Sequence, residues 1–103
     1  MKNLSQKEWV DALSQQQEAK ILDVRTLHEV VDGKIPEAIN LDILNPKDFT
    51  DGIEKLDKFS HYFVYCRAGS RSAQACAIMQ QLGFEHTYNL EGGFSEWNGA
   101  IEY

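Results

Sequence analysis

The sequence has little of what marks a disulfide-stabilised or metal-binding protein. Its 103 residues include two cysteines, Cys66 and Cys76, which are too few for a disulfide framework. Neither cysteine belongs to a Cys-x-x-Cys pair, and the three histidines are scattered along the chain. Because a zinc site needs clustered ligands of this kind, we expect no bound metal.

Positive charge and long apolar runs are also scarce. Ten Lys and Arg stand against 16 Asp and Glu, a formal net charge of −6, which argues against nucleic acid and anionic membranes as partners. No apolar run approaches the roughly 20 residues of a membrane-spanning helix. The first 13 residues turn polar too early for a signal peptide, so we expect a cytoplasmic protein. The length predicts a single domain over residues 1–103.

Strand and helix signals alternate along the chain. Strands are expected at 20–24, 38–41, 61–66 and 87–90, and helices are expected to begin at Ser5, Thr26, Asn45 and Ser72. Such alternation predicts an α/β domain with a largely parallel sheet, in which ligands bind beyond the carboxyl ends of the strands. Cys66 ends the clearest strand, directly before the expected helix 72–82.

The loop from Cys66 to Arg71 has the composition of an anion-binding site. Gly69 allows a sharp turn that directs successive N–H groups inward, and Ser70 or Ser72 is expected to cap the helix. Inward amides, a helix N-terminus and two guanidinium groups together attract a negative group. A cysteine in such surroundings ionises more easily than a free thiol with a pKa near 8.5. We therefore interpret Cys66 as a nucleophile rather than as a small core side chain.

Three segments of the chain form a recognisable series. They are Asp23-Val24-Arg25 with Glu29, Gly33, Ile35, Ala38 and Asn40, then Cys66 to Ser72 (CRAGSRS), then Leu90 to Trp97 (LEGGFSEW). In this order they resemble the rhodanese family, specifically the single-domain thiosulfate sulfurtransferases, over nearly the whole chain. The resemblance implies the rhodanese-like α/β fold, with a central, mostly parallel five-stranded sheet and helices on both faces. It implies no metal and no organic cofactor.

The resemblance also assigns roles to residues. Cys66 would carry a persulfide, and the donor's anionic end would bind the amides of the loop together with the Arg71 side chain. The loop residues concerned are Arg67, Ala68, Gly69, Ser70 and Arg71. Asp23 would support the end of its strand, and Arg25 and Glu29 are expected to form a structural pair near the site.

Three residues depart from the family pattern. Lys34 replaces the usual histidine, Val30 a frequent aromatic residue and Glu37 the usual glycine. We expect Glu37 to alter the rim of the site and the choice of acceptor.

The length of the cysteine loop bears on the substrate. Four residues separate Cys66 from Arg71, one fewer than in related cysteine phosphatases. The shorter loop favours a bound sulfur over a phosphate.

The expected reaction is sulfur transfer from thiosulfate or a persulfide donor, through Cys66, to cyanide or a cellular thiol in a ping-pong mechanism. A protein thiol stays open as the acceptor. A cysteine phosphatase, an arsenate reductase and a binding module without catalysis are the other candidates. We expect Cys76 to be a packed helix residue rather than a resolving thiol.

Overall fold

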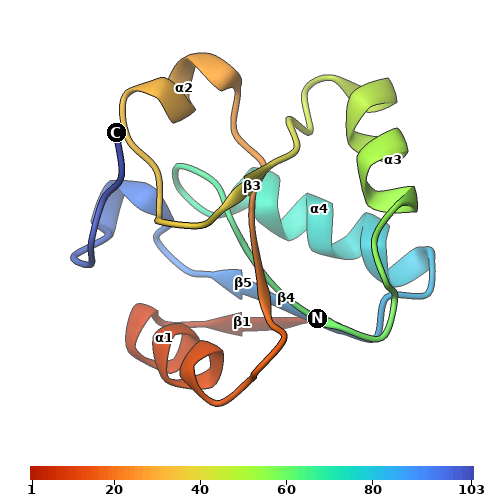
Figure 1. Cartoon of the computed structure of the whole chain (residues 1–103), viewed down its shortest axis with the longest axis horizontal. Coiled ribbons are helices and arrows are strands. Elements are labelled where there is room, and N and C mark those ends of the chain that lie inside the picture. Colours follow the sequence, from red (N-terminus) through yellow and green to blue (C-terminus); the bar gives the residue numbers. More distant parts are fainter.

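A computed structural model describes all 103 residues and centres on one five-stranded sheet (Figure 1). The strands are Lys2–Leu4 (β1), Lys20–Asp23 (β2), Ile39–Asn40 (β3), His61–Tyr65 (β4) and His86–Leu90 (β5). Their order is β1-β5-β4-β2-β3, and every neighbouring pair is parallel. The expected α/β class and parallel five-stranded sheet are therefore confirmed.

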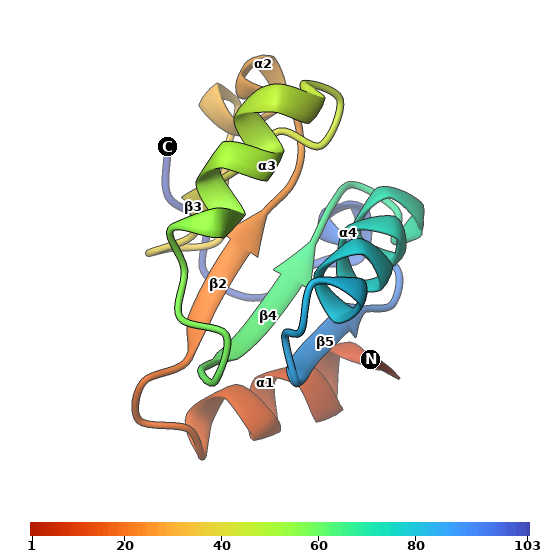
Figure 2. The same ribbon diagram turned by 90° about the vertical axis from the view of Figure 1, so that its right-hand side faces the viewer.

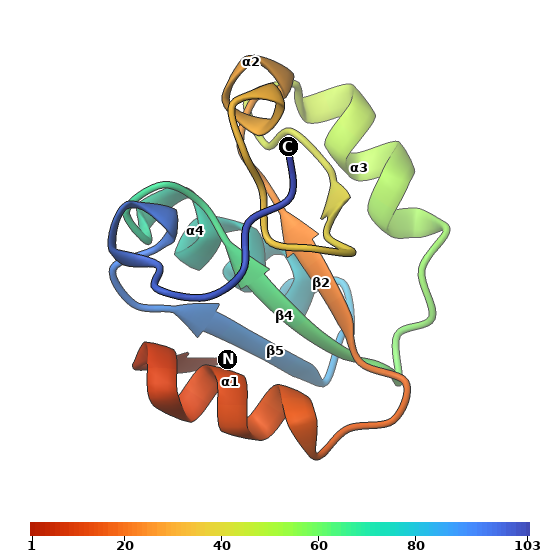
Figure 3. The same ribbon diagram turned by 60° about the vertical axis from the view of Figure 1, so that its left-hand side comes forward.

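Helices cover both faces of this sheet, as expected. They are Gln6–Ser14 (α1), Leu27–Val31 (α2), Pro46–Glu54 (α3) and Ser70–Gln81 (α4), followed by the 3-10 turn Phe94–Glu96 (η1). Helix α4 lies in front of the sheet in Figure 2 and behind it in Figure 3, where α1 is on the near side. No helix is long and apolar enough to cross a membrane.

Local sequence signals explain where three of the helices begin. Ser5 and Glu8 form a reciprocal capping box at α1, and Thr26 and Glu29 form one at α2. The Asn45 side chain caps α3, with proline in the first turn. These starts are the predicted ones, because each depends on residues three positions apart in the chain.

The structure corrects two local predictions. Helix α4 begins two residues earlier than expected, and Gly69 rather than Ser70 or Ser72 is its N-cap, without a side-chain cap. Strand β1 was not predicted, because three residues, of which two are polar and exposed, are too short a run to carry a strand pattern of their own. It forms by pairing with β5, Asn3 lying opposite Asn89.

Two apolar clusters fill the two sides of the sheet, and β4 contributes to both. Tyr62, Val64 and Cys66 face the cluster under α3 and α4. Phe63 and Tyr65 face the cluster under α1 and η1. This alternation follows from the two-residue repeat of a strand. It brings Cys66 to the carboxyl end of the central strand, on the α4 side.

Candidate active site

The Cys66 sulfur lies beneath the loop that follows β4, and the residue is 1% exposed. Its Sγ accepts hydrogen bonds from the Gly69 N–H at 3.1 Å and the Ser72 hydroxyl at 3.3 Å. Ser72 belongs to the first turn of α4 and is fully buried. The loop therefore directs one amide, one hydroxyl and a helix N-terminus at a single sulfur atom.

These donors act against burial in setting the acidity of Cys66. Burial raises the pKa of the thiol. Hydrogen bonds from the Ser72 hydroxyl and from the amides of Ser72, Gly69 and Ala68 lower the pKa by more than burial raises it, so the net pKa lies below its usual value. Hydrogen bonds to the charged form favour ionisation. The lowering comes mainly from the hydroxyl and amide groups. The sequence had suggested amides, a helix N-terminus and two guanidinium groups acting together.

Two glycines let the loop take this shape. Gly69 has φ +109°, a conformation that L side chains rarely adopt, and its N–H reaches the sulfur as a result. Gly93 packs so closely that a Cβ there would lie 2.5 Å from the Arg67 carbonyl oxygen. Phe94 and Ser95 then donate their N–H groups to the carbonyls of Cys66 and Arg67 at 2.8 and 2.9 Å. The Leu90–Trp97 motif is thus the support on which the cysteine loop rests.

Arg71 points from α4 to α2 and is held there by Glu29. Its two terminal nitrogens meet the two carboxylate oxygens at 2.7 and 3.0 Å, and both side chains are partly buried. The guanidinium holds the pKa of Glu29 at about 2. Glu29 also closes the capping box of α2. Because a guanidinium has five donors, Arg71 keeps N–H groups that Glu29 does not use.

Arg25 does not pair with Glu29, so that expectation was wrong. It binds Asp23 through both carboxylate oxygens, at 2.7 to 3.1 Å, and donates to the Gly33 carbonyl. The Tyr65 hydroxyl donates to the same carboxylate at 2.6 Å, and Arg25 lies 4.4 Å above the Phe94 ring. Burial lowers the pKa of Arg25. The contacts with Asp23 raise the pKa by more than burial lowers it, and the side chain stays charged.

Arg67 is exposed and borders a cavity beside the loop. The cavity has a volume of 360 Å³ and is lined by Arg25, Glu29, Asp32, Arg67, Phe94 and Ser95. Among its cations, Arg25 is engaged by Asp23, whereas Arg67 forms no ion pair. The cavity therefore offers one unpaired guanidinium next to the cysteine loop.

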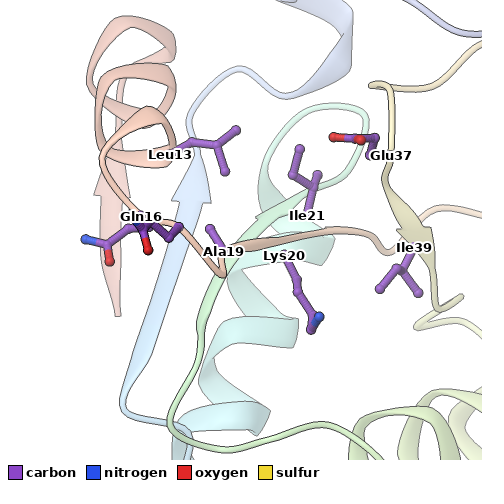
Figure 4. A pocket seen from close by; sticks show the side chains of 8 residues that line it. Leu13, Gln16, Ala19, Lys20, Ile21, Glu37 and Ile39 are labelled. Carbon is purple, nitrogen blue, oxygen red and sulfur yellow. The ribbon is translucent and has the colours of Figure 1, made fainter.

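Glu37 lies elsewhere, which contradicts its expected place at the rim. It lines a second cavity of 470 Å³ with Leu13, Gln16, Gln17, Ala19, Lys20, Ile21 and Ile39 (Figure 4). Lys20 and Ile21 begin β2, at the opposite end of that strand from the end beside Cys66. No residue of the cysteine loop contributes to this cavity.

Cys76 is packed as expected. It is fully buried in the α4 side of the core, and burial raises the pKa of its thiol to about 11. A thiol of this kind is inert at neutral pH. No group of three or more His, Cys, Asp or Glu side chains is arranged to hold a metal ion.

Two residues beside the sulfur were not expected there, Ser72 and Asn89. The sequence suggested Ser72 as a helix cap, although its place in the first turn of the helix after Cys66 also indicates a side chain near the sulfur. Asn89 gave no signal, because it comes next to Ser72 through the pairing of β5 with β4.

The fold and this site define a rhodanese-like protein, and the chain belongs to the Rhodanese-like domain family, whose profile matches residues 6–100. It is 33% identical to the "Putative sulfurtransferase YtwF" of Bacillus subtilis over 99% of this chain and 95% of the relative. It is 35% identical to a "Sulfurtransferase" of Allochromatium vinosum over 82% of this chain and 77% of the relative. The family to which it belongs is therefore one of sulfurtransferases.

Solved structures agree with this assignment. The rhodanese-like domain protein of Staphylococcus aureus superposes with a TM-score of 0.84 and 28% identity, over 99% of this chain and 97% of that one. Relatives called tRNA uridine(34) hydroxylase also match; this chain spans 28% of the one from Cytophaga hutchinsonii, at 32% identity.

Proposed function

We propose that the protein is a thiosulfate sulfurtransferase that works through a persulfide on Cys66. The observation that carries the proposal is the Cys66 sulfur held by the Gly69 amide and the Ser72 hydroxyl at the carboxyl end of the central strand. The net lowering of its pKa increases the fraction present as thiolate, which is the nucleophilic form of cysteine.

In the first half-reaction the Cys66 thiolate attacks the outer sulfur of thiosulfate. A new bond forms between Sγ and that sulfur, the sulfur–sulfur bond of the donor breaks, and sulfite leaves with the bonding electron pair. The fraction of Cys66 that is present as thiolate needs no general base, and the lowered pKa enlarges that fraction. The loop amides are in place before the reaction and stabilise negative charge without rearranging.

In the second half-reaction a thiolate or cyanide attacks the outer sulfur of the persulfide. A bond forms between the acceptor and that sulfur, the bond to Sγ breaks, and Cys66 leaves as a thiolate. The donor has departed before the acceptor reacts, so the kinetics are ping-pong. The sulfite end of the donor would bind against Arg67, which lines the 360 Å³ cavity. Arg71 does not line that cavity, but the N–H groups that Glu29 leaves free would assist next to it. A protein thiol stays a candidate acceptor beside small thiols.

Intact-protein mass spectrometry after thiosulfate treatment tests the proposal. The wild type should gain the mass of one sulfur atom and lose it on addition of cyanide. Cys66→Ser should gain nothing, and Cys76→Ser is the matched control that should load normally. A wild type that acquires no sulfur would refute the persulfide. Hydrolysis of a phosphate ester that depends on Cys66 would support the phosphatase alternative instead.

A further inference from the structure

The Ser72 hydroxyl lies within hydrogen-bond distance of three acceptors. These are the Cys66 sulfur at 3.3 Å, the Gly69 carbonyl oxygen at 3.2 Å and Asn89 Oδ1 at 2.5 Å. Ser72 is fully buried and Asn89 is 4% exposed. A hydroxyl carries a single proton, so Ser72 satisfies one of these acceptors well at any moment. The short distance favours Asn89 while Cys66 is uncharged.

The orientation of the Asn89 amide follows from its other contacts. Its Nδ2 donates to the Gly69 carbonyl at 3.2 Å and to Asn3 Oδ1 at 2.9 Å. A backbone carbonyl accepts and never donates, so the nitrogen must lie on the Gly69 side. Asn89 Oδ1 is thereby directed at Ser72, where it can act as an acceptor alone.

Ionisation of Cys66 changes which acceptor Ser72 serves. When the thiol loses its proton to solvent, the charged sulfur attracts the hydroxyl hydrogen more strongly than a neutral amide oxygen does. The hydroxyl then turns toward the sulfur, and its bond to Asn89 is lost. Two oxygen atoms without a proton between them are left facing each other in a buried site, which is unfavourable.

We propose that Asn89 is a positioning residue that competes with Cys66 for the Ser72 hydroxyl proton and so limits how strongly Ser72 stabilises the thiolate. The proposal rests on the sulfur transfer proposed above. There Cys66 must serve first as a nucleophile and then as a leaving group. A more stable thiolate leaves faster but attacks more slowly, so an intermediate stability suits both steps.

The same competition operates when Cys66 carries a persulfide. The negative charge then resides on the outer sulfur, and Sγ becomes a weak acceptor. The Ser72 proton returns to Asn89 Oδ1, and the loop amides are left to hold the outer sulfur. The edge strand β1 takes part, because Asn3 lies opposite Asn89 in the β1–β5 register and accepts from its amide.

The pH dependence of Cys66 alkylation by iodoacetamide, measured without any sulfur donor, tests the proposal. All variants carry Cys76→Ser, so that Cys66 is the one thiol that iodoacetamide can alkylate. Asn89→Leu, which keeps the branching at Cγ and removes the acceptor, should move the midpoint of the alkylation profile to lower pH by about half a unit or more. Ser72→Ala should move it to higher pH. In the protein that carries Ser72→Ala, adding Asn89→Leu should give no further lowering.

That cycle separates competition from a packing effect. A midpoint that Asn89→Leu leaves unchanged or raises would overturn the proposal. If Asn89→Leu lowered the alkylation midpoint equally in proteins with Ser72 and with Ser72→Ala, the proposal would also be overturned, because Asn89 would then not act through the hydroxyl. Since no sulfur donor is present, these outcomes are independent of whether the protein transfers sulfur.

A second measurement on the protein with Asn89 intact covers the case in which Asn89→Leu does not fold. The side-chain amide NMR signals of Asn89 should shift with pH at the Cys66 midpoint, because its oxygen loses a hydrogen bond as the thiolate forms. In Cys66→Ser the shift should be absent. Signals that stay constant through the Cys66 titration would contradict the proposal.

Discussion

Glu37 is the single residue other than glycine with a positive φ, at +71°. Pro36 precedes it, and the Ala38 N–H bonds the Ile35 carbonyl at 3.2 Å, which is the pattern of a type II turn with Glu37 in its third position. That position favours glycine, which explains why the family pattern has glycine there. The departure therefore affects the backbone of a turn and not the rim of the site.

Replacing Glu37 by glycine should stabilise the protein. A left-handed conformation costs an L residue about 1–2 kcal/mol, and the extra freedom of glycine in the unfolded chain offsets about 0.5–1 kcal/mol of the gain. We expect the free energy of unfolding in urea to rise by about 0.5 kcal/mol. Glu37→Ala, which removes the carboxylate but keeps the Cβ, is the control and should give no such rise.

Arg67 is the second residue with a testable role. If its unpaired guanidinium binds the donor, Arg67→Ala should raise the KM for thiosulfate about tenfold, the size expected for one lost charge-assisted hydrogen bond. Lys55→Ala changes the net charge equally at the far end of α3 and should leave KM unaltered. Equal KM values for wild type and Arg67→Ala would exclude Arg67 from donor binding.

At the scale of elements, the turn after β5 supports the cysteine loop through Gly93. Gly93→Ala would place a Cβ against the carbonyls of Cys66 and Arg67. We expect a loss of about 2–4 kcal/mol in the free energy of unfolding, because backbone atoms must move to make room. Gly83→Ala also has a positive φ, but its Cβ would make only ordinary contact with the Lys58 side chain, at 3.6 Å, and it should cost about 1 kcal/mol. Similar losses in both variants would mean that the close approach is unimportant.

Helix α2 is five residues long and buries no residue fully, so its position depends on polar contacts. Its link to α4 is the ion pair of Glu29 with Arg71. Arg71 holds the pKa of Glu29 at about 2, below the ordinary 4.5. A depressed carboxyl pKa stabilises the folded state above the unfolded pKa, and this contribution is lost as the pH falls from about 4.5 toward 2.

Glu29→Gln should remove this acid sensitivity. Glutamine keeps the capping box but not the charge. We expect the variant to be less stable than the wild type by about 1–2 kcal/mol at pH 6, with the difference shrinking as the pH approaches 2 in urea titrations. Asp51→Asn, which breaks the exposed Lys47–Asp51 pair, should have no measurable effect. A constant difference between wild type and Glu29→Gln across this range would contradict the assignment.

At the scale of the molecule, one sheet separates two cores that share β4. Trp9 and Trp97 report on the α1 side, where their rings meet edge to face at 5.8 Å. Cys76 reports on the α4 side. Because alternate residues of β4 belong to the two cores, loss of either should disrupt both.

The two cores should therefore unfold together. Tryptophan fluorescence and pulsed alkylation of Cys76, in Cys66→Ser protein, should give the same urea midpoint. The matched control is the far-ultraviolet circular dichroism signal, which should follow both. A Cys76 midpoint well below that of fluorescence would show that the α4 side opens independently.

Much of the architecture was predictable because its signals are local. The capping boxes at Ser5 and Thr26, the Asn45 cap and the β-forming run before Cys66 each depend on residues within a few positions of one another. The candidate role of Cys66 was likewise indicated by the residues that follow it. The family was suggested by three segments in order, at Asp23–Asn40, Cys66–Ser72 and Leu90–Trp97.

Tertiary structure decided which side chains pair and what surrounds the sulfur. Glu29 joins Arg71, because α2 lies beside the start of α4 once the sheet has formed. Strand β1 exists because β5 offers it an edge. Asn89 on β5 reaches Ser72 on α4, 17 positions away in the chain. The sequence by itself thus indicated most of the elements and marked Cys66 as the candidate nucleophile. Packing determined the ion pair and hydrogen bonds around it, since these contacts join residues 17 to 86 positions apart.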